Sequence, residues 1–390
     1  MEPANQKPLP TPTLSSDGAD AAKELTRLLE EYCTFSFLRL GDGELRFLLA
    51  AQGLETVPDR EGLRASCEIA YGTPALAARD YDRLLASFER CSVIDLHGGL
   101  PYNQANLGKL RWNRTADSIG TVSSGSTALL FDWIQHELGS YLSRHRSIVC
   151  GAEAGLLREL LTNVEYRQLA RSYIPDGSEI HFLQPRRDGS RLSEDLEEIK
   201  SDLANAVHQH HADTIFVSLG GAAKIVCHEL AEEIGIRAID FGSALRALTY
   251  SGSDGQAAWR SSHHPHLFRV PLRIYYPALR SAHPDMPMET LLSKAHAQLC
   301  LDLQRKVPLQ SITSTANDAT MFDASPENLK DFNEDLACYR KEILPLSRSS
   351  DEAGRLAAEF DLWRRKHGLG WDGRIFQFAV RMKSLLRAFR

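Results

Sequence analysis

The sequence has few cysteines, and no two of them are spaced as Cys-x-x-Cys, which argues against a zinc ribbon and against a thioredoxin-type redox motif. The seven cysteines are scattered, at positions 33, 67, 91, 150, 227, 300 and 338. Their odd number, with no secretory leader at the start of the sequence, predicts reduced thiols in a cytoplasmic protein.

The sequence also lacks a long apolar run and an excess of positive charge. No window reaches the roughly 18 apolar residues of a membrane-spanning helix, so any membrane contact is expected at the surface. A formal net charge of −6 argues against nucleic acid as a partner. Apolar residues make up 43% and charged residues 25%, which is enough for a globular core without disulfides. The sequence does not indicate the oligomeric state.

What is present divides the chain into three parts. Residues 1–20 are polar and rich in proline, which predicts a disordered tail. Residues 21–285 alternate apolar runs with helical patterns, whereas residues 286–390 contain helical patterns and no convincing strand. The turn-rich segment 311–326 is interpreted as a linker within this helical C-terminal region.

The middle part has the pattern of an α/β fold. Six apolar runs are predicted to be strands: 34–40, 91–97, 146–151, 179–184, 213–220 and 236–242. Helical patterns lie between them, including 74–90, 126–143, 154–170, 192–209 and 222–235. The alternation predicts crossover units and a mainly parallel sheet covered by helices. Most runs are almost continuously apolar, as expected for strands that are buried on both faces.

The segment Gly41-Asp42-Gly43-Glu44 joins the first predicted strand to a helical pattern. In one interpretation Asp42 caps the helix, and Glu44 meets the positive end of the helix dipole. In the other, the segment binds a ligand beyond the carboxyl end of a strand. Two carboxylates one residue apart can reach one hard cation that also binds phosphate oxygens. Gly43 would then let a diphosphate approach the backbone, and Arg39 could bind phosphate in a bidentate manner.

A second candidate phosphate site is Gly220-Gly221, which lies between a predicted strand and a helical pattern that carries Lys224 in its first turn. Backbone N–H groups at a helix start favour phosphate. A tight turn explains the two glycines equally well, and the full Gly-x-Gly-x-x-Gly spacing is missing.

Polar groups recur at other strand ends. Glu153 follows Gly151 after the third predicted strand, and Asp240 lies at the end of the last one. Because the carboxyl ends of neighbouring parallel strands meet at one edge of a sheet, these groups predict a shared cleft.

Three segments, in order, resemble the GT-D-fold glycosyltransferases. Residues 39–44 resemble the family's Asp-x-Glu motif, 215–242 resemble its "LGPTA…GYQAIDIGH" segment, and 147–157 resemble its strand-Gly-Glu segment. The resemblance covers about residues 24–250. It implies a Rossmann-like fold with helices on both faces and a Mn²⁺ or Mg²⁺ ion held by Asp42 and Glu44. It also implies a nucleoside-diphosphate sugar donor, most often a UDP-sugar.

Two departures from the family pattern keep a second interpretation open. The family's Pro-Thr corresponds to Gly221-Ala222 here, and its final His corresponds to Ser243. The leading interpretation is a metal-dependent glycosyltransferase that acts on a glycan or a lipid-linked acceptor. The alternative is a non-catalytic protein that binds a sugar nucleotide or serves as a scaffold.

In the enzyme interpretation, Arg39, Lys224 and the backbone near Gly220 share the charge of the departing diphosphate. The metal acts as a Lewis acid. An inverting enzyme also needs a base near the acceptor hydroxyl. Glu153 is the first candidate, followed by Asp95 and Asp240, although Glu153 could be an ordinary first-turn acid and Asp240 could hold the base or ribose of the nucleotide. The glycines expected at the donor site are Gly41, Gly43, Gly151, Gly220 and Gly221.

Three further segments have two interpretations each. Residues 374–390 carry five basic residues and no acid, so this segment is either a helix on the inner membrane surface or a terminal helix packed on the domain. The histidines in 208–211 and 261–266 lack the partners of a structural zinc site, which favours solvated histidines. The segment 96–113 is either a substrate loop or an ordinary connection.

Overall fold

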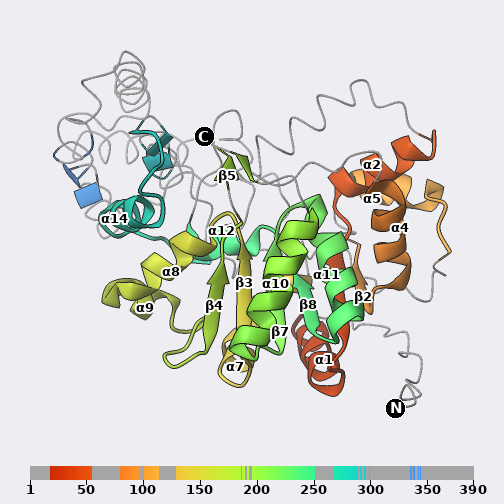
Figure 1. Ribbon diagram of the computed structural model, residues 1–390, viewed down its shortest axis with the longest axis horizontal. Helices are drawn as coiled ribbons and strands as arrows, with labels where there is room; N and C mark the ends of the chain where they lie inside the picture. The colour runs from red at the N-terminus through yellow and green to blue at the C-terminus, as the bar shows by residue number, and fades with distance from the viewer. Residues whose placement is uncertain are drawn as a thin grey trace, which may run out of the picture.

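The computed structural model describes residues 18–54, 80–96, 101–113, 129–185, 187–188, 191–192, 196–250 and 267–288, with single residues from 290 to 343. Six strands in this part of the chain form one sheet in the order β2-β1-β8-β7-β3-β4, and every pair is parallel (Figure 1). The strands are β1 (Phe35–Arg39), β2 (Val93–Asp95), β3 (Ser147–Gly151), β4 (Ile180–Leu183), β7 (Thr214–Ser218) and β8 (Arg237–Asp240). The six predicted strands and the α/β fold class are therefore confirmed.

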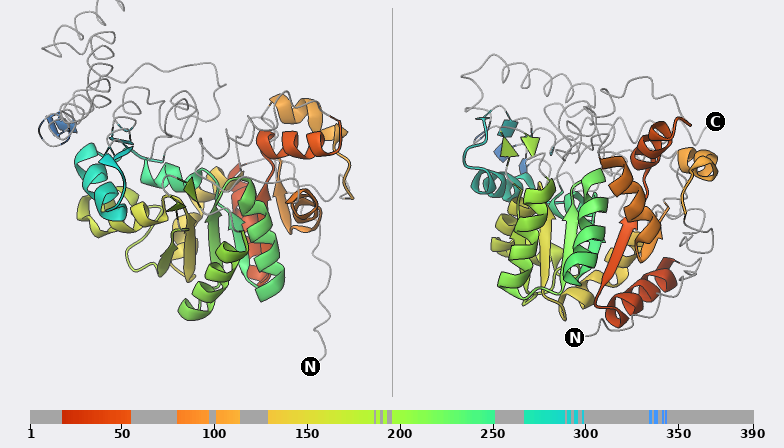
Figure 2. Two further views of the ribbon diagram at one scale, coloured as in Figure 1. Left: turned by 45° about the horizontal axis from the view of Figure 1, so that its top comes forward. Right: turned by 45° about the vertical axis from the view of Figure 1, so that its right-hand side comes forward.

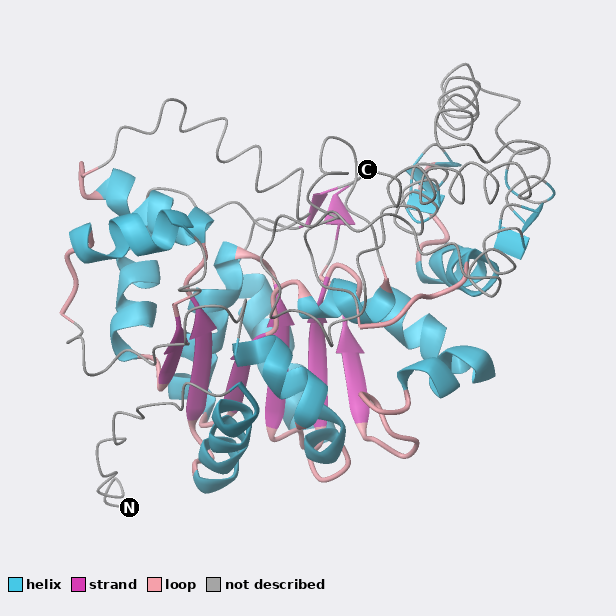
Figure 3. Ribbon diagram, turned by 180° about the vertical axis from the view of Figure 1, so that it is seen from behind, coloured by secondary structure: helices cyan, strands magenta, loops and turns pink. Residues whose placement is uncertain are grey.

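Helices cover both faces of the sheet, because alternate strand residues point to opposite sides. Phe35 and Phe37 of β1 pack in one core cluster, whereas Leu38 packs in the other. The first cluster includes residues of α1 (Gly18–Glu31), α6 (Leu129–His136), α7 (Leu138–Leu142), α8 (Ala154–Thr162), α12 (Ala244–Thr249) and α14 (Leu272–Ala282). The second includes residues of α2 (Asp42–Ala51), α4 (Tyr81–Arg90), α10 (Leu196–His210) and α11 (Gly221–Ile234). Figure 1 shows α10 and α11 in front of the sheet, and Figure 3 shows the molecule from behind.

Two of the predicted helices are each divided in the structure. The pattern at 126–143 forms α6 and α7, and the pattern at 154–170 forms α8 and α9 (Val164–Ala170). The second division occurs at Asn163, whose side-chain oxygen accepts a hydrogen bond from the Tyr166 N–H at 3.1 Å. Asparagine is a favoured N-cap, so it starts a new helix within an apolar pattern that continues through it.

Other boundaries also differ from the sequence-based expectation. Helix α1 begins at Gly18, so residues 18–20 belong to a helix and not to the tail. Within 96–113 the chain forms α5 (Pro101–Asn106) and the 3₁₀ helix η2 (Leu107–Lys109). A short antiparallel hairpin, β5 (Arg187–Asp188) and β6 (Arg191–Leu192), was not predicted. Figure 1 places this hairpin beyond the edge at which the sheet strands end.

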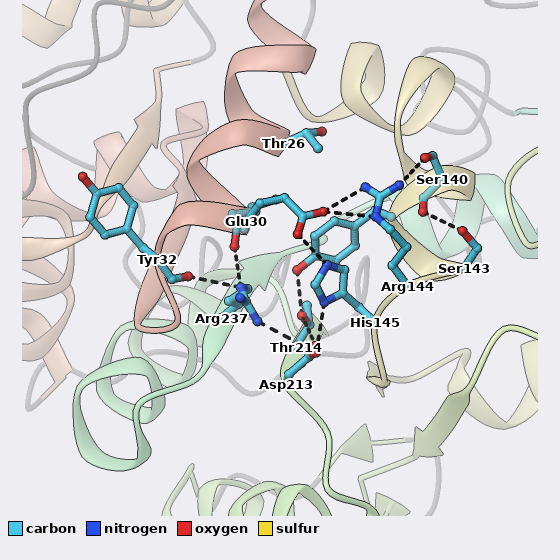
Figure 4. A network of polar contacts seen from close by, with 12 residues as sticks. Thr26, Glu30, Tyr32, Ser140, Ser143, Arg144, His145, Asp213, Thr214 and Arg237 are labelled. Atoms are coloured by element: carbon cyan, nitrogen blue, oxygen red, sulfur yellow. Dashed lines mark hydrogen bonds and ion pairs between the residues drawn. The ribbon is translucent and has the colours of Figure 1, made fainter.

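Helix α1 is held at the opposite, amino-terminal end of the strands, where Figure 2 shows it from another side. His145 lies there between two carboxylates, with Nδ1 2.9 Å from Asp213 Oδ2 and Nε2 3.2 Å from Glu30 Oε2 (Figure 4). Arg144 donates to Glu30 at 2.8 Å, and Arg237 of β8 donates to the Tyr32 carbonyl at 3.1 Å. These contacts tie the end of α1 to the starts of β7 and β8.

Several predictions fall outside the described residues: the remainder of the tail, 1–17, the histidines in 261–266, the linker 311–326 and the basic segment 374–390. Two described residues of the later region contact the start of α14 and the segment before it. Gln298 donates to the Val270 carbonyl at 2.8 Å, and Asp335 accepts from the Leu272 N–H at 2.8 Å. None of the described helices is both long and apolar enough to cross a membrane.

Candidate functional site at the carboxyl ends of the strands

The Gly-Asp-Gly-Glu segment connects β1 to α2 at the carboxyl end of the strand, as the sequence indicates. The expected cap, however, is shifted by one residue, because the helix begins at Asp42 and Gly41 occupies the N-cap position. Glu44 supplies the capping contact, since its Oε2 accepts the Gly41 N–H at 3.1 Å. A glutamate that reaches back from the third helical position is half of a capping box. Asp42 is exposed, so its carboxylate faces solvent.

Lys224, in the first turn of α11, lies between two carboxylates at this edge. Its Nζ is 3.0 Å from Glu44 Oε1 and 2.9 Å from Asp240 Oδ2, and it donates to the Gly220 carbonyl at 3.1 Å. An ammonium group has three N–H donors, and here three acceptors surround it. Burial lowers the pKa of Lys224, but the Asp240 and Glu44 carboxylates outweigh it, and the net pKa lies above its usual value. The lysine is therefore a buried, permanent cation.

Glu44 and Asp240 respond to the same cation. Burial raises the pKa of Glu44, but the charge and hydrogen bond of Lys224 outweigh it and hold the net pKa below its usual value. Asp240 is fully buried at the end of β8, where its Oδ2 also accepts the Arg39 N–H at 3.2 Å. Its Oδ1 has no hydrogen-bond partner among the described residues.

Arg39 reaches this cluster through a gap left by Gly242. The Gly242 backbone has φ of +47°, and a Cβ at this position would lie 2.2 Å from Arg39 Nη1. Glycine adopts this φ without strain, whereas a larger residue would be strained here and would push the Arg39 guanidinium out of this position. The Arg39 side chain is buried and lies over the Phe131 ring, 5.9 Å from its centroid. Gly242 was not among the expected site residues, although it directly follows the Asp240-Phe241 pair of the motif.

The two glycines of the second candidate phosphate site have different roles. Gly220 has φ 56° and ψ −133°, a backbone conformation open only to glycine, and it precedes the first residue of α11. Gly221 begins that helix and is followed by buried alanines. The turn brings the start of α11 beside the end of β1, because α11 packs against β1 as well as β8. The N–H groups at this helix start are a suitable place for phosphate.

At the end of β3, the structure gives Gly151 a packing role. A Cβ there would lie 2.9 Å from the Ser218 carbonyl oxygen and 2.8 Å from Leu245 Cδ2, so Gly151 permits a close approach of chain segments. Glu153 occupies the N-cap position of α8, and its Oε1 accepts from Arg246 Nε at 3.1 Å. Only 12% of the Glu153 side chain and 14% of that of Arg246 are exposed. Arg246 is a site residue that the sequence did not indicate, because only the fold brings it to Glu153.

Asn103 connects the ends of β1 and β2. It lies buried in α5, and its amide nitrogen donates to the Leu40 and Leu96 carbonyls, both at 2.9 Å. Asp95, another candidate base, is fully buried at the end of β2, next to Arg39 in the sheet register. The segment 96–113 therefore has at least one clear structural role, which is to fix the strand ends that carry the Gly-Asp-Gly-Glu turn.

The histidines of 208–211 do not form a metal cluster. His210 stacks on His181 of β4 with ring centroids 3.7 Å apart, and burial together with this neighbour lowers the pKa of His181. The pair lines a cavity of about 350 Å³ beside β4 and α10. Among the described residues, no group of three or more His, Cys, Asp or Glu side chains could hold a metal ion.

The two carboxylates that the resemblance assigns to a metal differ in how well they fit one. Asp42 is exposed and fits a cation that takes its other ligands from water and phosphate. Glu44 fits poorly, because Lys224 and the Gly41 N–H already occupy its two oxygens. Two unit charges 4 Å apart interact by about 4 kcal/mol at an effective dielectric constant of about 20, and a divalent ion doubles this. A metal sharing Glu44 with Lys224 would face that repulsion.

Comparison with known families agrees with this fold. The family model described as a GT-D fold-like domain matches residues 17–248, more than half of the chain. No curated protein and no solved structure matches the chain. The matched residues extend from α1 to α12 and include every group of the cluster around Lys224.

Proposed function

The chain belongs to the GT-D fold-like family, and from this premise we propose that it is a metal-dependent glycosyltransferase. Its donor would be a nucleoside-diphosphate sugar, a UDP-sugar by the family resemblance, and its acceptor a glycan or a lipid-linked glycan. The observation that carries this proposal is the convergence of Lys224, Glu44 and Asp240 at the carboxyl edge of a parallel sheet. Ligands of open α/β sheets bind at this edge.

In this proposal the chain stabilises a departing diphosphate. The N–H groups after Gly220 point from the start of α11, and the Lys224 ammonium lies in the same turn. Fixed donors and charges of this kind favour negative charge that develops on the leaving group. Asp42 would hold Mn²⁺ or Mg²⁺ together with phosphate oxygens, and the bound ion would add Lewis-acid stabilisation.

Burial supports Glu153 over the other candidate bases. Asp95 and Asp240 are fully buried and cannot meet an acceptor hydroxyl without a structural change. Glu153 retains some exposure, and Arg246 fixes the position of its carboxylate. Because Arg246 Nε already donates to Glu153 Oε1, proton transfer to that oxygen would require Arg246 to shift or to share the carboxylate with the acceptor.

The test is a panel of nucleotide sugars with Mn²⁺, read by thermal shift and by release of the nucleoside diphosphate. A ligand that binds only the folded state raises its stability, so the donor should raise Tm. We expect one donor to do so and to be hydrolysed slowly without an acceptor. If no nucleotide sugar in the panel binds or is turned over, the proposal is wrong.

The complete hydrogen bonding of the Lys224 ammonium favours a second candidate function. In this alternative the protein is not catalytic and binds a sugar nucleotide or serves as a scaffold. The three N–H donors of Lys224 all have acceptors within the protein, as in a purely structural cluster. Donor binding without turnover in any acceptor extract would favour this candidate. Turnover that Mn²⁺ stimulates in the wild type but not in the Asp42→Asn variant would exclude it.

A cytoplasmic location, with the segment 374–390 on the inner membrane surface, stays a prediction.

A further inference from the structure

The contacts of Glu44 differ from those of a metal ligand. One oxygen accepts from the Lys224 ammonium at 3.0 Å, and the other accepts from the Gly41 N–H at 3.1 Å. We propose that Glu44 is a positioning residue that holds Lys224 in place until the diphosphate of the donor displaces it, and that it does not bind the metal. The identity of the donor rests on the function proposed above, whereas the pairing of Glu44 with Lys224 does not.

The two carboxylate partners of Lys224 are unequal. Asp240 is fully buried on a central strand and also accepts the Arg39 N–H at 3.2 Å. Glu44 retains 15% exposure and lies in the first turn of α2, beside the exposed Asp42. Of the two carboxylate partners, only Glu44 is partly exposed, so we expect an incoming phosphate oxygen to reach the ammonium from the side of Glu44. The diphosphate would take the place of Glu44 at Lys224, while Asp240 and the Gly220 carbonyl keep their hydrogen bonds.

This exchange predicts the sign of one mutational effect. Glu44→Gln keeps the shape of the side chain and removes its negative charge, so it removes the group that competes with the diphosphate for the ammonium. The affinity for UDP, measured without metal by calorimetry, should be equal to or higher than that of the wild type. Lys224→Met should weaken UDP binding by at least about tenfold, because a charged hydrogen bond is lost. A tenfold weaker affinity in Glu44→Gln would overturn the proposal.

Metal binding provides an independent measurement. Free Mn²⁺ can be followed by electron paramagnetic resonance in titrations of the protein with UDP present. We expect Asp42→Asn to weaken Mn²⁺ binding by at least about tenfold and Glu44→Gln to leave it within about threefold of the wild type. Equal losses in both variants would show that Glu44 is a metal ligand and would overturn the proposal.

A double-mutant cycle tests the pairing without any ligand. Lys224→Met leaves Glu44 and Asp240 without their cation, so adding Glu44→Gln should restore part of the lost Tm. Lys200 provides a matched control, because it too lies between carboxylates, 2.5 Å from Glu229 and 2.7 Å from Glu233, but on α10 and away from the strand ends. Strictly additive effects of the Lys224 and Glu44 variants on Tm would contradict the pairing.

The control also separates a positioning role from a merely structural one. UDP should change the coupling between Lys224 and Glu44 and leave the coupling between Lys200 and Glu229 unchanged. If UDP and other nucleoside diphosphates fail to bind the wild type, the proposed function is wrong. The double-mutant cycle without ligand then still decides whether Glu44 pairs with Lys224. Coupling that UDP binding leaves unaltered would reduce Glu44 to a structural partner and overturn its role toward the donor.

Discussion

The two ends of the sheet each place one basic side chain between two carboxylates, but with different consequences. At the carboxyl end, Lys224 lies between Glu44 and Asp240, and its three donors are satisfied. At the amino end, His145 lies between Glu30 and Asp213 (Figure 4). It stacks on Tyr141, with ring centroids 4.1 Å apart. The lysine is charged at every physiological pH, whereas the histidine can lose its charge.

The elements that each cluster joins show what the difference means. The amino-end cluster connects a peripheral helix, α1, to the segment before β7, and Arg144 and Arg237 surround it. The carboxyl-end cluster connects α2, α11 and β8 beside the exposed Asp42 and the open backbone of Gly43. Similar charge arrangements therefore serve for docking a helix at one end and, by our proposal, for ligand binding at the other.

The largest expected effect is that of Lys224→Met. Removing one partner of a buried ion pair leaves the other charge buried without compensation, which typically costs about 3–5 kcal/mol. Two carboxylates would be left here, so we expect a loss of that size in urea unfolding and no measurable donor turnover. A stability within about 1 kcal/mol of the wild type would contradict the buried cluster.

Asp42→Ala should separate activity from stability. The side chain is exposed at the first position of α2, so its contribution to the helix dipole is only about 0.3–1 kcal/mol. Donor hydrolysis in Mn²⁺ should nevertheless fall by about 100-fold if Asp42 holds the metal. If Asp42→Ala instead unfolds the protein, and the molecules that stay folded keep their specific activity, then Asp42 is a structural residue and does not hold the metal.

His145→Leu should affect stability alone. The substitution removes the hydrogen bond to Asp213 and the ion-pair contact with Glu30. A hydrogen bond to a charged group is worth about 1.5–3 kcal/mol, and the leucine offsets part of its loss. We expect unfolding at lower urea concentration together with unchanged donor affinity and turnover. A large loss of donor affinity in correctly folded His145→Leu would show that the two ends of the sheet are not independent.

The smallest effect is the pH dependence of the amino-end cluster. Its hydrogen bond to Asp213 raises the pKa of His145, against the effect of burial, so the folded state binds this proton more tightly than the unfolded state. The resulting stabilisation is fully present below the unfolded pKa of about 6.5 and is lost as the pH rises through the higher folded pKa. The difference in unfolding free energy between wild type and His145→Asn should therefore shrink from pH 6.5 upward.

The contribution of the two carboxylates of that cluster to stability depends on pH in the opposite direction. Burial raises the pKa of Asp213 and of Glu30, but hydrogen bonds and charges from His145, and from Arg144 for Glu30, hold both pKa values below their usual range. Their contribution is present above the unfolded pKa values and is lost as the pH falls through the folded ones. A difference between wild type and His145→Asn that does not vary with pH would exclude a charged imidazole in this contact.

Local pattern was sufficient to predict much of the fold. The strands β1, β3 and β7 are apolar runs buried along their whole length, and this property is visible in sequence because it belongs to consecutive residues. Helix boundaries were less certain, as Asn163 shows. A residue that favours the N-cap position can lie inside a continuous helix or can start a new one. The packing of the segments before and after it decides which of these occurs.

The sequence by itself determined the six strands and the recurrence of polar groups at their carboxyl ends, because each strand and the turn after it are short, continuous segments. It did not determine which charged groups become partners. Lys224 meets Glu44 only because β8 lies between β1 and β7 in the sheet, and Arg246 meets Glu153 only because α12 packs against α8. Strand order and helix packing depend on contacts between distant residues, so only the tertiary structure decided that Glu44 holds a lysine.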